Sequence, residues 1–117
     1  MRMSEVDFGA RLPIDGYGPG FFRVGGEVYR GHLAILGGEV AAWPGLSAPE
    51  PLLHAAGDLD LVLVGTGATL TPPPAPFRAA LEDAGLALEP MATDAACRTY
   101  NVLLAEGRRV GAALLTL

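Results

Sequence analysis

A short run of apolar residues, Leu61 to Val64, ends at the sequence Gly65-Thr66-Gly67. Apolar residues without polar alternation are typical of a strand that is buried on both faces of a parallel or mixed sheet. The glycines indicate a sharp turn at the carboxyl end of this strand. In open α/β sheets, ligands usually bind at that edge of the sheet. The run therefore predicts a central strand, and it marks Gly65, Thr66 and Gly67 as candidate ligand-binding residues.

The rest of the second half alternates between helical and strand patterns. We expect a helix at residues 77–84, a strand at 86–91, a helix at 95–106 and a strand at 110–117. A strand that follows a crossover helix usually pairs in parallel with the strand before that helix. The expected core is therefore a parallel or mixed sheet that contains at least the last three strands.

The first half predicts antiparallel pairing. Gly25-Gly26 and Gly37-Gly38 are two-residue hairpin signals, and they divide residues 20–43 into a three-stranded meander. The preceding segment, residues 14–20, is dense in Gly and Pro and is expected to form turns. Ser47 begins a capping-box pattern, which predicts a short helix after it. The order of elements indicates an α/β fold.

Composition limits the classes of function. The chain has 117 residues, which suits one domain over residues 1–117, and its net charge is −5. An acidic chain without a basic run is a poor partner for nucleic acid. The sequence contains no Lys, which excludes a Schiff-base lysine and a Walker-type lysine.

Composition also bears on location. A single cysteine, Cys97, cannot form an internal disulfide, which favours a reducing compartment. No apolar stretch reaches the ~20 residues that span a bilayer. The N-terminal residues 1–7 are mixed and acidic, unlike a signal peptide. We therefore expect a cytoplasmic protein that does not insert into a membrane.

The densest polar cluster of the chain runs from Thr93 to Asn101 and opens a predicted helix. It should lie near Gly65-Thr66-Gly67 if the two preceding strands are neighbours. Backbone N–H groups at a helix start favour an anion, and Arg98 would add a guanidinium. The alternative is structural, with Thr93 or Asp94 as a helix cap and Asn101 paired with backbone. The candidate residues of this cluster are Thr93, Asp94, Cys97, Arg98, Tyr100 and Asn101.

Catalytic, cofactor and metal motifs are incomplete. The start of a helix can lower the pKa of a thiol, but no spacing places an imidazole beside Cys97, which favours a buried, inert cysteine. Gly65-Thr66-Gly67 lacks the third glycine and the following helix of a dinucleotide loop. His32 and His54 are too far apart in sequence to form a metal site of recognised spacing, and His32 is expected to face solvent. No cofactor and no metal are expected.

Three aromatic residues, Phe21, Tyr29 and Trp43, fall on the predicted meander. Aromatic side chains on a partly exposed sheet often anchor protein interfaces. We therefore take these three residues as candidates for a partner surface.

Several motifs together resemble a known family of small domains. They are Ile14-Asp15-Gly16-Tyr17-Gly18, Phe22-Arg23-Val24, Tyr29-Arg30-Gly31, Trp43, Gly65-Thr66-Gly67 and residues 99–110. The family includes mitochondrial complex I assembly factor 3 and the adipogenesis-associated protein with the same domain. The resemblance covers nearly the whole chain, and it implies a three-layer α/β domain with mixed sheets and no established catalytic activity. Its eukaryotic members act as assembly or interaction proteins.

The expected fold is thus α/β, a single three-layer domain with an N-terminal antiparallel meander, a mixed or parallel central sheet and about three helices. The expected function is a non-enzymatic protein-binding or assembly-factor-like module with a protein partner. The alternative is a small anionic ligand-binding protein or enzyme that uses a crevice between residues 65–67 and 93–101.

Overall fold

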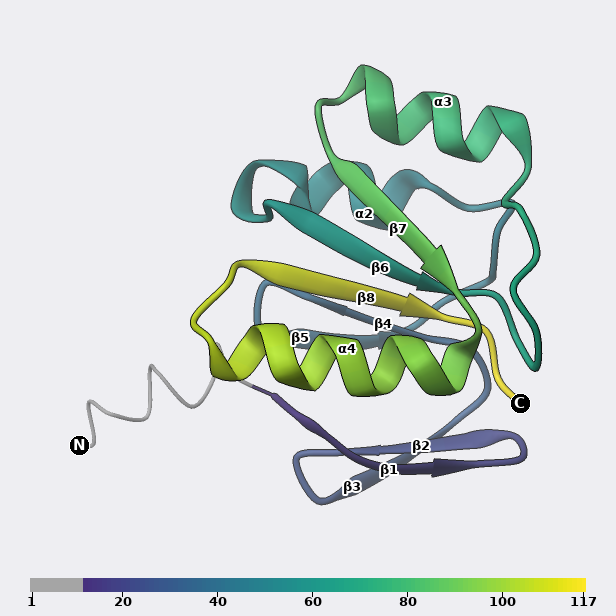
Figure 1. Ribbon diagram of the computed structural model, residues 1–117, viewed down its shortest axis with the longest axis vertical. Coiled ribbons are helices and arrows are strands. Elements are labelled where there is room, and N and C mark those ends of the chain that lie inside the picture. The colour runs from purple at the N-terminus through teal and green to yellow at the C-terminus, as the bar shows by residue number, and fades with distance from the viewer. Residues whose placement is uncertain (1–11) are drawn as a thin grey trace.

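Two sheets and three α-helices make up residues 12–117, the part of the chain that the computed structural model describes (Figure 1). The expectation for residues 1–7 lies outside this part. The helices are α2 (Glu50–Ala55), α3 (Ala75–Asp83) and α4 (Thr93–Ala105), and a 3₁₀ turn at Ala56–Asp58 follows α2. The strands are β1 (Ile14–Gly18), β2 (Phe21–Val24), β3 (Glu27–Arg30), β4 (Leu33–Leu36), β5 (Glu39–Ala42), β6 (Leu61–Gly65), β7 (Ala87–Met91) and β8 (Val110–Leu114).

The central sheet has five strands in the order β5-β4-β8-β6-β7. β6 pairs in parallel with β7 and β8, whereas β4 pairs antiparallel with both β8 and β5. Val62, Leu63 and Val64 of β6 are fully buried, as the apolar run predicts. The central sheet is therefore mixed, and its parallel part consists of the last three strands of the chain.

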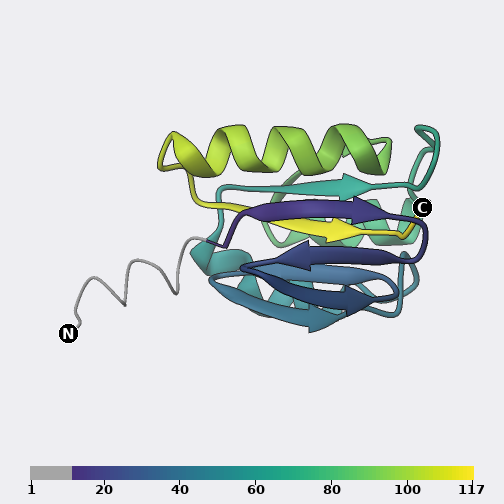
Figure 2. The same ribbon diagram turned by 90° about the horizontal axis from the view of Figure 1, so that it is seen from below.

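The molecule has three layers, and each face of the central sheet is covered differently. In Figure 1, α4 lies in front of this sheet and α2 behind it. Asn101 of α4 is bonded to Ile14 of β1, and residues of both elements share one core, so that α4 and the three-stranded sheet together cover the same face. Figure 2 shows β1 and α4 running lengthwise in roughly the same direction across the molecule. The core on that side includes Phe22, Val24, Ile35, Leu63, Tyr100 and Leu114. The core on the other side includes Trp43, Leu52, Val62, Val64, Phe77 and Leu81.

The α/β fold is confirmed, but the N-terminal meander is shifted along the chain. It consists of β1, β2 and β3, which cover residues 14–30 rather than 20–43. The expected long strand at residues 27–36 is divided at Gly31, whose φ of +92° breaks the extended backbone. β4 and β5 therefore leave the meander and pair with the central sheet.

The turn expected at residues 14–20 is also wrong, because Ile14–Gly18 forms β1. Its glycines serve side-chain packing within the sheet. A Cβ atom at Gly18 would lie 2.6 Å from Cε1 of Phe21, and one at Gly16 would lie 3.7 Å from Nη1 of Arg23. The two side chains of β2 thus lie across the bare backbone of β1.

The capping box at Ser47 does not form. The N-cap of α2 is Pro49, and no side chain caps this helix. Ser47 lies two residues before that position, in a loop that Trp43 holds by donating a hydrogen bond from Nε1 to the carbonyl oxygen of Ala48 at 2.9 Å. The predicted helix exists, but it begins at the prolines instead of the serine.

Candidate functional site

The carboxyl end of β6 and the start of α4 meet, as the sequence predicts. The backbone N–H of Thr93 donates to the carbonyl oxygen of Gly67 at 2.8 Å, and the N–H of Thr66 donates to that of Met91 at 2.9 Å. In the reverse direction, the N–H of Gly67 donates to Oγ1 of Thr93 at 2.8 Å. The two candidate stretches are therefore joined directly to each other at one edge of the central sheet.

Thr93 is the centre of this junction. Its side chain is fully buried, and its hydroxyl donates to the carbonyl oxygen of Leu115 at 2.8 Å while it accepts from Gly67. It thus connects the segments that follow β6 and β8 with the start of α4. The expected capping role is wrong for both candidates, because the N-cap residue is Ala92 and no side chain caps the helix.

Gly65 allows this close packing. A Cβ atom at Gly65 would lie 2.8 Å from Oγ1 of Thr93 and 3.1 Å from its Cα. Both distances are shorter than normal van der Waals contact, so a larger residue would push α4 away from β6. Gly65 therefore allows the backbone of β6 to approach the backbone at the start of α4.

Thr66 organises the loop that follows β6. Its Oγ1 donates to the carbonyl oxygen of Thr69 at 2.7 Å and accepts from the N–H of Thr71 at 3.0 Å. The residue as a whole is buried, at 8% relative exposure. Both polar functions of this side chain are thus used inside the loop.

The exposed side chains at the start of α4 turn toward β1. Nη1 of Arg98 lies 3.2 Å from Oη of Tyr17 and 3.8 Å from a carboxylate oxygen of Asp94. The other carboxylate oxygen of Asp94 accepts from the N–H of Ala95 at 2.8 Å. Arg98 is thus held on the outside of α4, with its guanidinium in contact with the three-stranded sheet.

Tyr100 and Asn101 hold the start of β1. Asn101 accepts a hydrogen bond from the N–H of Ile14 and donates one to the carbonyl oxygen of the same residue, both at 2.8 Å. Oη of Tyr100 donates to the carbonyl oxygen of Leu12 at 3.0 Å, and burial raises the pKa of this phenol to about 12. The structural role suggested for Asn101 by its sequence is confirmed.

Cys97 is buried under the first turns of α4, as the sequence favours. The pKa of its thiol is raised to about 12, mainly by burial and also by the charge of Asp94, while the charge of Arg98 acts in the opposite direction. A thiol in this state is a poor nucleophile.

The described cavities lie away from this junction. Three cavities of about 290, 420 and 510 Å³ are lined by other parts of residues 12–117, and none of the three is lined by residues 65–67 or 93–98. The first lies at the opposite end of β6 and β8, beside Arg108 and Arg109. Within residues 12–117, no three His, Cys, Asp or Glu side chains gather closely enough to hold a metal ion.

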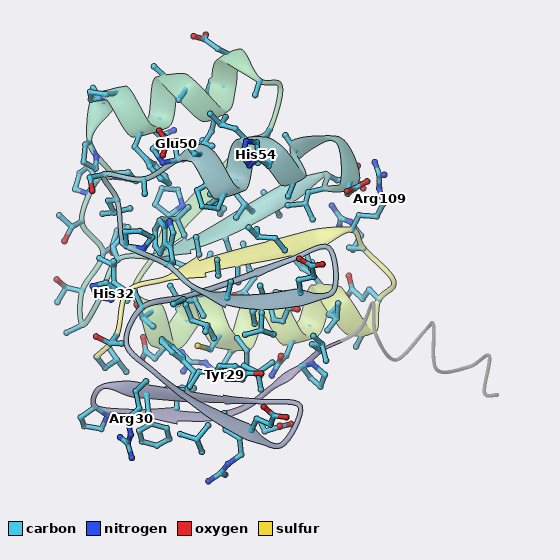
Figure 3. All side chains as sticks on the ribbon, turned by 180° about the vertical axis from the view of Figure 1, so that it is seen from behind. Tyr29, Arg30, His32, Glu50, His54 and Arg109 are labelled. Atoms are coloured by element: carbon cyan, nitrogen blue, oxygen red, sulfur yellow. The ribbon has the colours of Figure 1, made fainter. Side chains whose placement is uncertain are left out.

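Of the three aromatic candidates for a partner surface, Trp43 is misplaced. Its side chain is 3% exposed and its ring centre lies 6.1 Å from that of Phe77. It follows β5 and turns into the core beneath α3, so the expectation of an exposed ring is wrong. Figure 3 shows Tyr29 pointing toward the body of the molecule and Arg30 pointing away from it. Phe21, the register partner of Arg30, is half-buried on the outer side of the three-stranded sheet.

Sequence reasoning overlooked the residues that share this outer side with Phe21. The register places Arg23 opposite Val28 and Phe21 opposite Arg30, so all four side chains lie on one face of the sheet. The alternation of side chains along β2 and β3 would have predicted that these four residues share a face. His32, expected to face solvent, is half-buried and accepts a hydrogen bond at Nδ1 from the N–H of Thr116 at 3.0 Å.

The comparisons with known proteins agree with this fold. The family described as "Protein of unknown function (DUF498/DUF598)" matches residues 14–115. The chain belongs to the DUF498 family. A protein of Rhodobacter capsulatus that is described as uncharacterized is 50% identical over 115 residues, which are 98% of this chain and 93% of that protein.

Solved structures show the same arrangement. The crystal structure of an outer membrane protein from Bartonella henselae is similar with a TM-score of 0.85 and 33% identity, over 93% of this chain and 98% of that one. The solution structure of a Bordetella pertussis protein described as a Mth938-like domain gives a TM-score of 0.74 and 30% identity, over 91% and 86% of the two chains. In this chain, the helices within residues 12–117 are each too short or too polar to cross a membrane.

Proposed function

We propose that the chain is a non-enzymatic protein-binding module whose partner contacts the outer face of the three-stranded sheet. We define this outer face by Phe21, Arg23, Val28 and Arg30. The observation that carries the proposal is that two apolar and two cationic side chains share this face, in a chain whose net charge is −5.

The outer face has the composition of an interface. Val28 is 49% exposed, so it presents apolar surface to solvent on this face. Phe21 lies over Gly18 and the guanidinium of Arg23 lies over Gly16, so both side chains are in contact range of the backbone of β1. Aromatic and arginine side chains provide most hot spots of protein interfaces, and side chains already held in place lose less entropy on binding.

The charge of the outer face indicates the chemistry of the partner. Arg23 and Arg30 form no ion pair with any other residue in the described part of the chain. Guanidinium groups beside apolar side chains complement a partner surface that carries carboxylates around an apolar centre. We therefore expect an acidic, partly apolar protein surface as the partner.

The internal use of polar groups supports a non-enzymatic role. At the junction of β6 and α4, the hydroxyls of Thr66 and Thr93 are paired with backbone, and farther along α4 the amide of Asn101 is paired with the backbone of Ile14. An anionic ligand at residues 65–67 and 93–101 would have to displace these bonds, so this alternative has less support. The resemblance to assembly factors agrees with a protein partner, and a respiratory-complex role remains one form of the proposal.

The experiment is photo-cross-linking in the native cell from two exposed valines. A photoreactive amino acid is placed at Val28 on the outer face or, as the matched control, at Val102, which is 56% exposed on α4. We expect a discrete adduct from position 28 and none of the same mass from position 102. Equal adducts from both positions, or none from position 28, would contradict the proposal.

Charge reversal then tests the chemistry of the contact. The double variant Arg23→Glu/Arg30→Glu should lose the adduct formed from position 28. Arg78→Glu/Arg108→Glu changes the net charge equally, at a half-buried site on α3 and an exposed site between α4 and β8, and it should keep the adduct. Loss of the adduct in both variants would assign the effect to net charge instead of the outer face.

We further propose that the protein acts in the cytoplasm. The buried, unpaired Cys97 agrees with a reducing compartment. Cell fractionation with an antibody against the chain tests this proposal, and recovery in the outer membrane fraction, the location named for the Bartonella henselae protein, would refute it.

A further inference from the structure

We propose that β5 of one copy pairs antiparallel with β5 of a second copy, which extends the central sheet across a two-fold axis. This surface is separate from the outer face of the three-stranded sheet. The inference rests on the hydrogen-bonding groups at the free edge of β5, on the register in which two copies of these groups complement each other and on the space beside the strand.

The edges of the two sheets differ in their protection against strand addition. β7 contains Pro90, which lacks an N–H, and β1 has its first residue bonded on the outer side by Asn101. β3 begins and ends with the charged residues Glu27 and Arg30. β5 instead presents three consecutive uncharged residues, Val40 to Ala42, without proline or bulge. Such an edge readily accepts another strand.

The register of β5 shows which groups are available. The N–H of Trp43 donates to the carbonyl oxygen of His32 at 3.1 Å, which places this pair among the hydrogen-bonded pairs of the ladder. Because antiparallel pairs alternate, Ala41 and Glu39 also bond inward to β4. Val40 and Ala42 therefore direct their N–H and C=O groups outward.

These outward groups are self-complementary in one register. If Val40 pairs with Ala42 of a second copy, two-fold symmetry gives four backbone hydrogen bonds and brings the two Ala41 residues face to face. The Cα atoms of such a non-hydrogen-bonded pair lie about 4.5 Å apart, a distance that alanine side chains tolerate. The two Glu39 carboxylates are then separated by four residues along the strands, roughly 14 Å, which exceeds the Debye length at physiological salt.

The neighbourhood of β5 leaves room for the second strand. On the side of α2, a cavity of about 420 Å³ lies beside Ala41 and Ala42 and is bounded by Pro51 and His54. Figure 3 shows His54 on α2, the helix that bounds this cavity. Side chains of an added strand would project over this hollow without displacing the helix.

Single cysteines test the register. Ala41→Cys places two thiols opposite each other, within the range of distances that a disulfide bridges. Ala42→Cys places its thiols on strand positions roughly 9 Å apart, beyond that range. We expect covalent dimers from Ala41→Cys under mild oxidation and almost none from Ala42→Cys or from the native chain, whose Cys97 is buried. Equal cross-linking of the two variants, or none from Ala41→Cys, would overturn the proposal.

The oligomeric state gives a second readout. In sedimentation equilibrium, the mass of the native chain should rise from that of one copy toward that of two as concentration increases. Ala42→Pro removes an outward N–H without touching the inward ladder, and it should stay at the mass of one copy with an unchanged circular dichroism spectrum. A native chain that keeps the mass of one copy throughout would overturn the proposal. Because Arg23→Glu/Arg30→Glu leaves β5 intact, its dimerisation should match that of the native chain, which separates this test from that of the proposed function.

Discussion

At the scale of single residues, Thr93 contributes most to the junction between β6, α4 and the end of β8. Thr93→Val keeps the shape of the side chain but leaves the N–H of Gly67 and the carbonyl of Leu115 without their partner. We expect a loss of about 2–4 kcal/mol in the free energy of unfolding, because unsatisfied buried groups keep their full desolvation cost. Urea titration measures the loss. Thr99→Val, on the same helix but partly exposed, should change stability by less than about 0.5 kcal/mol.

Cys97 offers a test of reactivity at the same scale. Its thiol pKa is about 12 in the folded protein against 9.0 ordinarily, so the thiolate fraction at pH 8 falls about a thousandfold on folding. Labelling with a disulfide reagent at pH 8 should therefore be slower by at least this factor in the native protein than in urea. Because the folded pKa is raised, the thiol also favours folding below pH 9, and this contribution is lost as the pH rises toward 12. Equal labelling rates in both states would show that folding does not suppress the reactivity of Cys97.

At the scale of elements, the attachment of β1 to α4 depends on one amide. Asn101→Ala removes both hydrogen bonds to Ile14, and we expect the start of β1 to separate from α4 at a cost of about 1–3 kcal/mol. Hydrogen exchange should show lost protection at the Ile14 amide, with little change in β6 or β8. Asn101→Asp keeps the acceptor for the N–H but sets a carboxylate oxygen against the Ile14 carbonyl. Its stability should recover as the pH falls, because the protonated acid can donate again, whereas a pH-independent deficit would contradict the paired arrangement.

The elements also show which parts of the fold the sequence determines. The run at residues 61–64 and the helices at 75–83 and 93–105 follow from local periodicity, and they formed close to the expected positions. The division between β3 and β4 at Gly31 could not be predicted from the sequence, because a single glycine inside an alternating pattern is compatible with a bulge and with a strand end. Only the pairing of β4 with β8, a contact distant in sequence, decides between them.

The candidate site shows the same limit. Strand order places Gly65-Thr66-Gly67 beside Thr93, and this proximity was predictable from the order of strands and helices. The partners of the polar groups were not, because Thr93 bonds to Leu115 and Asn101 to Ile14, both far along the chain. Similarly, the sequence does not determine which way the side chain of Trp43 points. Its burial depends on Phe77 of α3, a residue distant in sequence.

At the scale of the whole molecule, the five-stranded sheet is the common wall of two cores. Leu63 and Leu114 face the core beneath α4, whereas Val62 and Val64 face the core beneath α2 and α3. Adjacent residues of one strand thus belong to different cores. Neither core can be opened without exposing the sheet that supports the other.

This arrangement predicts a single cooperative unfolding transition. Trp43 is the only tryptophan of the chain and reports on the core beneath α3, whereas labelling of Cys97 reports on the core beneath α4. In urea, the fluorescence of Trp43, the reactivity of Cys97 and the circular dichroism signal should change with the same midpoint and the same slope. Phe77→Leu changes only the core beneath α3. It should nevertheless shift all three midpoints together, because β6 contributes side chains to both cores and cannot unfold on one face alone. Separate midpoints in the native chain, or a shift confined to the tryptophan signal in the variant, would show that the two cores unfold independently and that the shared sheet does not couple them.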